Sequence, residues 1–440
     1  MRTVLLLALA GLIPAQVSAA AQTHNPSSDR PPNYESMDPG DQLYLVENAV
    51  EHEEFFARRG LRYHDPVIQE IVDRLAATVV PTPLDDYVRY RVNLVRDPSP
   101  ISFSLADGQI YIHTGLLARL QNESQLAAVL AHEAHHVAAH HHIEANRARR
   151  SKERAAGVGA FAVDLFIPLS GIVSYLTTSF AHAARTEFTN EMELEADAAC
   201  MELIENAGHP AAAALNTLER IMQDPELSTP SLLSSWTTYE ALSVRRNALQ
   251  QQLGVSASLA QQSNASGRPL LLRQIIEMTI DDYIRLDRPG TAIELADTLI
   301  EVRPDAFLFA AKGDAFVALG PRPVRDTEEL SQRESKRRKL LTRAELHEEI
   351  MRTDAGQSKF VANQQLAVDA YEQSLQLNEN AARAHRGLGG IYFHQANYRK
   401  SGKHYLRYVK LTPNALDRSL VMEKLQHIRK ELVIKRETEK

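Results

Sequence analysis

The residues best suited to chemistry lie in one stretch, Leu130 to Ile143, which reads LAHEAHHVAAHHHI and holds six histidines. Within it, His132, Glu133 and His136 form the pattern HExxH. On a helix, positions i and i+4 lie one above the other, so the two histidines can present imidazole nitrogens to one Zn2+ ion. The glutamate between them can act as general base toward an attacking water. The pattern indicates a candidate zinc hydrolase site.

A catalytic zinc site needs a third protein ligand and an open fourth position, so another donor should follow downstream. The segment TNEMELEADAAC offers Glu193, and Asp197 lies four residues further on, on the same helix face. Asp197 can accept an N–H from a ligand imidazole and so fix its orientation. Glu191 and Glu195 are the competing carboxylates, and their helical positions predict that they face solvent.

Four histidines of the stretch are not needed by this site. His140 lies one turn beyond His136 and is the alternative ligand among them. We expect all four to lie on the surface or beside the ligands, where extra imidazoles can bind stray metal weakly. Cys200 shares the stripe of Glu193, and we expect it to be a small buried packing residue. The four histidines are His135, His140, His141 and His142.

Periodicity predicts the elements that must position these residues. A small sheet should precede the histidine-rich helix, which Asn122 would cap. A turn at Asp107-Gly108 should join two of its strands. Helices are expected at 41–59, 66–79, 122–142 and 189–207, and strands at 90–97 and within 101–115.

The first twenty residues read MRTVLLLALAGLIPAQVSAA, with a basic start, a short apolar run and small residues at the end. This layout predicts a secretory signal peptide over 1–20, followed by a polar leader over 21–41. The alternative, an N-terminal membrane anchor, is disfavoured because the apolar run is short. Cys200 is the one cysteine, so no internal disulfide can form. We expect export to a bacterial periplasm.

Composition bounds the remaining possibilities. With 440 residues, 44% hydrophobic and 24% charged, the chain can bury full cores in two or three domains. A net charge of -7 gives no basic footprint, so nucleic-acid binding is excluded as a main function. The segment 156–182 is the most apolar of the mature chain, but Asp164, Pro168 and Gly171 interrupt it. We expect a buried helical hairpin there, with peripheral membrane contact as the alternative.

The C-terminal region contains a repeat. Segments 294–306, 369–381 and 403–415 superpose, and Tyr371 and Tyr405 are 34 residues apart, which is the tetratricopeptide period. Gly313 aligns with Gly389 in the preceding helix of each repeat. Because 16 residues separate Gly389 from Tyr405 but 58 separate Gly313 from Tyr371, one repeat carries an insertion, at about 321–362. The pattern predicts a tetratricopeptide domain over 266–440, behind a zinc metallopeptidase domain over 42–262.

The motifs AHEAHHVAAHH and NEMELEAD, preceded by SLADGQIYIHTGLL, resemble the zinc metallopeptidases related to the CAAX prenyl protease and HtpX. The likeness extends to exported members that carry tetratricopeptide repeats. It implies one Zn2+ per chain on His132, His136 and Glu193, with Glu133 as base. It also implies that the strand QIYIHTG is an edge strand, against which an extended substrate peptide pairs.

The chain departs from this family at three places. His135 stands where a small residue is usual, and Thr189-Asn190 replaces a serine-arginine pair. Tyr239-Glu240 replaces a His-Pro pair whose histidine can occupy the fourth position on zinc, although Arg245 is retained. Arg245 and Tyr239 are the candidates for contacts to substrate or to the oxyanion.

The expected fold is mainly α with a small β-sheet: an HExxH domain built on a gluzincin-type helix pair, then a tetratricopeptide α-solenoid. The expected function is a periplasmic zinc endopeptidase that cleaves misfolded or stalled exported proteins. The resemblance also implies help with outer-membrane β-barrel assembly, in which the repeats contact the assembly machinery. The alternative is a repeat-based chaperone or scaffold whose metal site is not used for proteolysis.

Overall fold

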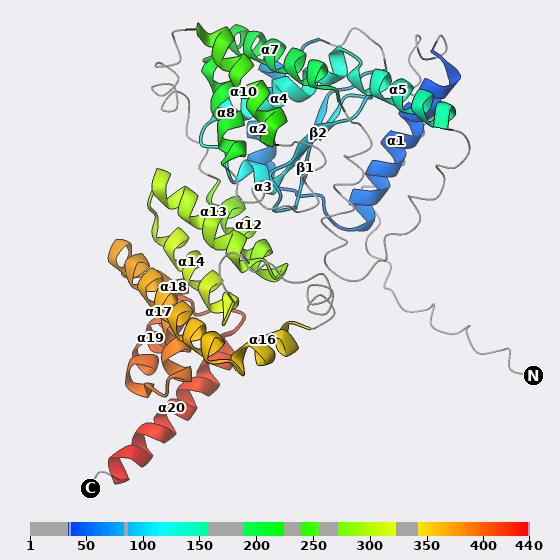
Figure 1. The fold of residues 1–440 in the computed structure, drawn as a ribbon. Coiled ribbons are helices and arrows are strands. Elements are labelled where there is room, and N and C mark those ends of the chain that lie inside the picture. Colours follow the sequence, from blue (N-terminus) through cyan, green and yellow to red (C-terminus); the bar gives the residue numbers. More distant parts are fainter. Residues whose placement is uncertain are drawn as a thin grey trace, which may run out of the picture.

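The computed structural model describes residues 34, 37–82, 87–156, 188–223, 239–254, 272–322 and 342–438. The expected signal peptide, most of the polar leader and nearly all of the apolar segment 156–182 lie outside these residues. Figure 1 shows helices around a small sheet in the N-terminal part, followed by a row of packed helices that ends at the C-terminus. Within the described ranges, no helix combines the length and apolar character that crossing a membrane requires.

The helices of the N-terminal part begin close to the expected positions, with one correction. The expected single helix over 122–142 is wrong, because α4 ends at Ala138 and α5 starts at His141. His140 between them adopts a left-handed φ of 56°, which ends α4 and redirects the chain. The helices are α1 (Pro39–Arg58), α2 (Pro66–Val79), α3 (Thr114–Leu117), α4 (Glu123–Ala138), α5 (His141–Ala156), α7 (Asn190–Asn206), α8 (Ala212–Met222) and α10 (Tyr239–Leu253).

The sheet has three strands, β1 (Arg91–Val95), β2 (Ser102–Ser104) and β3 (Gln109–His113), in the order β1-β3-β2. β2 and β3 form the expected hairpin, and Gly108 at its turn has a φ of 96° that favours glycine. β1 pairs with β3 in parallel. The expectation that the strand QIYIH lies at the edge is wrong, since β3 is central and β2 forms an edge of the described sheet.

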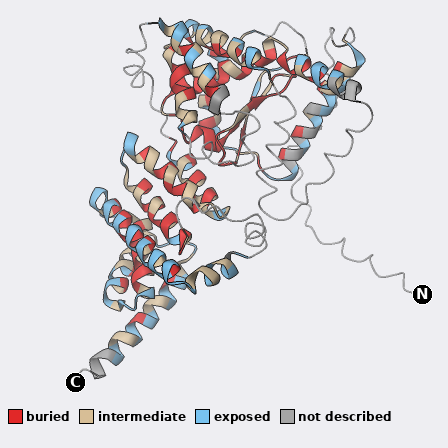
Figure 2. Ribbon diagram, in the orientation of Figure 1, coloured by how far each residue is buried: buried red, intermediate tan, exposed pale blue. Residues whose placement is uncertain are grey.

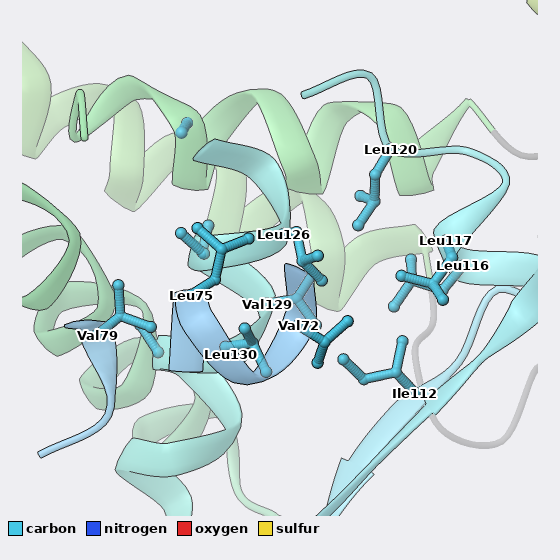
Figure 3. Close-up of a cluster of buried hydrophobic side chains, with 14 of the residues drawn as sticks. Val72, Leu75, Val79, Ile112, Leu116, Leu117, Leu120, Leu126, Val129 and Leu130 are labelled. Carbon is cyan, nitrogen blue, oxygen red and sulfur yellow. The ribbon is translucent and has the colours of Figure 1, made fainter. Parts of the chain in front are cut away.

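α4 is the central helix of this part. It packs against α2, α7, α8 and the sheet, and nearly all of its side chains are buried. Figure 3 shows Leu126, Val129 and Leu130 of α4 meeting Val72 of α2 and Ile112 of β3. Buried residues gather around the same sheet and helices in Figure 2. A helix enclosed in this way is a rigid support for any side chains that project from it.

The C-terminal part consists of successive helices in which a glycine of one helix receives a tyrosine ring of a later one. A Cβ on Gly313 would lie 2.5 Å from the Tyr371 ring, and a Cβ on Gly389 would lie 2.6 Å from the Tyr405 ring. The glycine and tyrosine positions that the repeat pattern aligned therefore make equivalent contacts in the two repeats. The helices are α12 (Arg273–Arg285), α13 (Pro289–Val302), α14 (Ala306–Leu319), α16 (Arg343–Met351), α17 (Asp354–Leu377), α18 (Ala382–His394), α19 (Tyr398–Leu411) and α20 (Arg418–Thr438).

The segment expected as an insertion, 321–362, lies between α14 and its packing partner α17. Residues 323–341 are outside the described ranges. The remainder contains α16, which starts with a capping box formed by Thr342 and Glu345, and the first turns of α17. This part of the insertion is therefore helical.

α12 joins the two parts of the chain through polar contacts. Arg96 donates two hydrogen bonds, of 2.9 and 2.8 Å, to the carboxylate of Asp282. The Tyr283 hydroxyl donates to the Pro98 carbonyl at 2.6 Å and accepts from Arg119 at 3.1 Å. Because Tyr283 and Arg119 are buried, these bonds form away from competing water.

Replacing Tyr283 with Phe should lower the free energy of unfolding by about 1–3 kcal/mol, because both buried partners lose a hydrogen bond. Urea unfolding followed by circular dichroism measures the change. Tyr392→Phe is the matched control: Tyr392 is also buried, and within the described residues its side chain makes ring contacts, with Lys400 and His404. If both variants lost the same free energy of unfolding, the hydrogen bonds of the Tyr283 hydroxyl would not stabilise the contact between the N-terminal and C-terminal parts.

Candidate metal centre

Two packed helices carry the candidate ligands. His132, Glu133 and His136 lie on α4, whose cap Asn122 accepts a hydrogen bond from the Gln125 N–H at 3.0 Å. Glu193 lies in the first turn of α7, which packs along α4. Figure 1 shows the two helices side by side above the sheet. The capped starts and close packing fix the height of each ligand along its helix.

The ligand atoms form a small triangle. His132 Nε2 lies 3.1 Å from His136 Nε2 and 3.5 Å from Glu193 Oε2. His136 Nε2 lies 3.7 Å from Glu193 Oε1. Ligand atoms at Zn–N and Zn–O distances of about 2.0–2.2 Å around a tetrahedral ion are separated by roughly 3.3–3.6 Å. The side chains therefore fit one small divalent cation with two imidazoles and one carboxylate.

Asp197 holds the first imidazole. Its Oδ1 lies 3.1 Å from His132 Nδ1, the ring nitrogen that points away from the triangle. A carboxylate in this position orients a ligand histidine and makes its free nitrogen more basic. The sequence placed Asp197 in this role by helical spacing, and the structure brings it to the same side of α7 as Glu193.

Arg245 on α10 binds both carboxylates of α7. Its Nε and Nη2 donate to the two oxygens of Asp197 at 2.8 and 2.7 Å. Its Nη1 lies 2.7 Å from Glu193 Oε2. Sequence reasoning missed this contact, although two acidic residues one turn apart on a buried face already required a cation. The expected contact of Arg245 with substrate stays a prediction, as does that of Tyr239, of which only the backbone at the start of α10 is described.

The arginine keeps the carboxylates ionised. Burial by itself raises the pKa of Glu193 and of Asp197, but the charge of Arg245 and the interactions with His132 together outweigh it and hold both pKa values below their ordinary range. Burial likewise lowers the pKa of His132, but hydrogen bonds to Asp197 and Glu193 outweigh it and raise the value to about 10 in the metal-free protein. A metal ion that bound to His132 would therefore have to displace a proton from it.

Glu133 sits beside the triangle with a different environment. Its Oε1 accepts a hydrogen bond of 2.7 Å from the Ser102 hydroxyl on β2. Burial raises the pKa of Glu133 above its ordinary value. A buried carboxylate beside a metal site can serve as a general base that accepts and returns a proton. Sequence analysis did not single out Ser102, because its contact with Glu133 depends on the position of β2.

The other four histidines are buried or half-buried, and none is a simple surface residue. His140 Nδ1 lies 3.1 Å from the Tyr87 hydroxyl, and His142 Nε2 lies 3.0 Å from the Ser104 hydroxyl. His141 Nδ1 lies 3.0 Å from His136 Nδ1, and His135 Nε2 lies 3.4 Å from Glu195.

The remaining residues of α7 follow the expectation in part. Glu191 is exposed, as expected. The Glu195 side chain is 59% exposed, but it contacts two histidines rather than solvent alone. Cys200 is buried, with its thiol 3.2 Å from the Ala128 carbonyl, which confirms its packing role.

Replacing Arg245 with Leu should destabilise the metal-free protein by about 3–5 kcal/mol, because two buried carboxylates lose their cation. Chemical denaturation in the presence of a chelator measures this. The control is Arg352→Leu, which removes an exposed i,i+4 ion pair with Glu348 and should cost less than about 1 kcal/mol. A small effect at Arg245 would contradict the inference that it neutralises this site.

Comparison with known proteins agrees with this geometry. Residues 63–261 match the sequence profile of Peptidase family M48. A putative beta-barrel assembly-enhancing protease of Vibrio cholerae is 30% identical over 154 residues, covering 34% of this chain and 32% of that protein. The mitochondrial metalloendopeptidase OMA1 of Schizosaccharomyces pombe is 31% identical over 134 residues, covering 30% of this chain and 38% of that protein.

The beta-barrel assembly-enhancing protease of Escherichia coli is 24% identical over 173 residues, covering 38% of this chain and 35% of that protein. The matched segment thus spans about a third of the length of each of these relatives. The profile match contains all four residues of the HExxH and Glu193 set. Residues 63–261, slightly less than half of the chain, are therefore similar to the metallopeptidase family M48.

Proposed function

We propose that the protein is a zinc-dependent endopeptidase in which His132, His136 and Glu193 bind one Zn2+ and Glu133 is the catalytic base. The observation that carries this proposal is the ligand triangle beside a buried carboxylate of raised pKa. Two imidazoles and one carboxylate are a donor set that zinc hydrolases use. The family match and the metalloendopeptidase names among the relatives support it.

The side chains account for the proton transfers of peptide hydrolysis. Bound Zn2+ would supply Lewis acidity, which activates water and polarises the scissile carbonyl. Glu133 would accept the proton of the attacking water and deliver it to the leaving amine. The hydrogen bond from Ser102 orients the Glu133 carboxylate for this transfer. Asp197 and Arg245 keep His132 and Glu193 oriented throughout.

β2 offers a path for an extended substrate. Ile101 and Leu105 bond to β3 through their backbones, so the alternate residues Ser102 and Ser104 direct their N–H and C=O groups away from β3. Within the described chain these groups have no backbone partner. A peptide that pairs with this edge would run past Glu133, which Ser102 contacts directly. We therefore propose that an extended substrate pairs with β2, and not with β3 as the sequence had indicated.

The C-terminal helices are proposed to be tetratricopeptide repeats that hold substrate or dock on a partner. The equivalent Gly313–Tyr371 and Gly389–Tyr405 contacts support a repeating helix pair. A cavity of about 540 Å³ opens among α14, α17, α18 and α20, lined by aromatic, acidic and basic side chains including Arg386. Such a mixed lining suits segments of unfolded protein.

The location and partners follow from the N-terminal sequence and from the relatives. A signal-peptide pattern over 1–20 supports export to the periplasm, and two of the relatives are named beta-barrel assembly-enhancing proteases. We propose that misfolded or stalled exported proteins are the substrates and that outer-membrane β-barrel assembly is assisted. The alternative function, a chaperone or scaffold without proteolysis, is supported by the same cavity in the helical part.

Glu133→Gln should keep the bound zinc and lower the cleavage of casein by at least about 100-fold, because the amide cannot accept the proton. Metal content and cleavage are measured on the same preparation. Glu191→Gln, an exposed carboxylate of α7, is the control and should cleave at the wild-type rate. Wild-type cleavage by Glu133→Gln would refute the base assignment. Rescue of outer-membrane protein assembly by this variant in a deletion strain would favour the chaperone function.

Zinc affinity should rise about tenfold per pH unit between pH 6 and 8, because binding displaces the proton of His132, whose pKa is raised to about 10. In the folded protein without metal, His132 is protonated at every pH well below 10 and must lose that proton to bind zinc. The zinc affinity therefore increases as the pH rises. Competition with a chromophoric chelator in the Glu133→Gln protein measures the affinity without self-cleavage. An affinity independent of pH would show that His132 does not exchange a proton for metal.

A further inference from the structure

A second group of potential ligands lies one step along the same helix pair. It consists of His135 on α4, Glu195 on α7 and His141 at the start of α5. His135 Nε2 lies 3.4 Å from Glu195 Oε1, and His141 Nε2 lies 3.6 Å from Glu195 Oε2. One ligand atom from each residue lies within 4.8 Å of the others. The mechanism of peptide hydrolysis uses none of these three side chains.

The geometry of this group parallels that of the first triangle. The rings of His135 and His141 are 5.7 Å apart at 73°, against 4.8 Å and 76° for His132 and His136. Both nitrogen–oxygen separations are longer than a normal N–H···O hydrogen bond of about 2.7–3.2 Å. They match the roughly 3.3–3.6 Å between ligands of a tetrahedral Zn2+. The side chains are thus spaced closely enough to act as ligands of one ion, and without an ion His135 and Glu195 share a long hydrogen bond.

The break between α4 and α5 creates the group. In a continuous helix, the side chains of His135 and His141 would lie about 120° apart around the axis and more than one turn apart along it. The left-handed conformation of His140 redirects the chain, so that His141 turns back toward His135. His135 precedes the candidate ligand His136, and Glu195 lies two residues after Glu193. The packing of α4 on α7 therefore positions the residues of both candidate metal sites.

Charge and exposure also distinguish this group from a structural ion pair. Among the described residues, no arginine or lysine neutralises Glu195, in contrast to Arg245 beside Glu193. The Glu195 side chain is 59% exposed whereas that of His141 is 3% exposed, so the group opens to solvent on the carboxylate side. A cation can enter from there and meet two imidazoles.

We propose that His135, His141 and Glu195 form a second, weaker site for a borderline divalent cation such as Zn2+. Imidazole and carboxylate ligands suit this class of ion. The affinity should be lower than at the first site, since Glu195 is exposed and the described residues place no carboxylate on the imidazoles in the way that Asp197 contacts His132.

The two sites are connected by the hydrogen bond between His136 Nδ1 and His141 Nδ1, which are 3.0 Å apart. A neutral imidazole has one N–H donor and one acceptor nitrogen. If His136 binds metal through Nε2, its proton is on Nδ1 and donates to His141 Nδ1. The proton of His141 is then on Nε2, which is the atom that the second site requires. A second cation must therefore break this bond and disturb His136, so excess Zn2+ should inhibit the enzyme.

Equilibrium dialysis of the full mature chain against Zn2+, with bound metal measured by mass spectrometry, tests the site and rests on no activity. Wild type should bind one ion tightly and a second at least about tenfold more weakly. Glu195→Gln and His135→Ala should each lose the weak ion and keep the tight one, and the exposed control His64→Ala should keep both. His132→Ala should keep the weak ion, so failure of the proposed catalytic site is distinguishable. Unchanged weak binding in Glu195→Gln and His135→Ala would overturn the proposal.

Inhibition by free Zn2+ tests the connection between the sites. Glu195→Gln should cleave like wild type at low Zn2+ and should need at least about tenfold more free Zn2+ for half-inhibition. Identical inhibition curves for the two proteins would overturn the inhibitory role of this site.

Discussion

Two carboxylates, Glu193 and Asp197, lie buried one helical turn apart on α7, and the guanidinium of Arg245 lets both remain ionised. The rest of the site depends on this arrangement. An ionised Glu193 can share a cation with His132 and His136, and an ionised Asp197 can orient His132. Without the arginine, burial and mutual repulsion would favour protonation of one carboxyl. The site would then lose either a ligand or the residue that orients one.

The fold supplies the rigidity that this arrangement needs. α4 is enclosed by α2, α7, α8 and the sheet, so its two candidate ligand histidines project from a helix that cannot shift without disrupting a packed core. β2 contributes the hydroxyl of Ser102, which donates a hydrogen bond to Glu133. The candidate metal ligands, the candidate base and the edge strand β2 thus come from separate segments, which the packing of α4 on α7 and on the sheet holds in register. The contacts of α12 then join the helical C-terminal part to this core.

The sequence allowed the local features to be predicted well. Spacing alone placed His132, His136, Glu193 and Asp197 on two helix faces, and turn chemistry placed the hairpin at Gly108. Features that depend on tertiary contacts were not predictable in this way. The end of α4 at Ala138 rests on a left-handed non-glycine residue, His140, for which helix propensity gives no signal. The central position of β3 depends on β1, which pairs across a chain crossover, and an alternating pattern does not reveal strand order.

The central claim is that His132, His136 and Glu193 hold one catalytic zinc ion. Anomalous diffraction from crystals of the purified full chain, recorded on both sides of the zinc absorption edge, tests it most directly. The account predicts a strong peak about 2.0–2.2 Å from His132 Nε2, His136 Nε2 and a carboxylate oxygen of Glu193, with Arg245 still bound to Asp197. A zinc peak coordinated by other side chains, or a fully loaded protein with no peak within reach of Glu193, would contradict it.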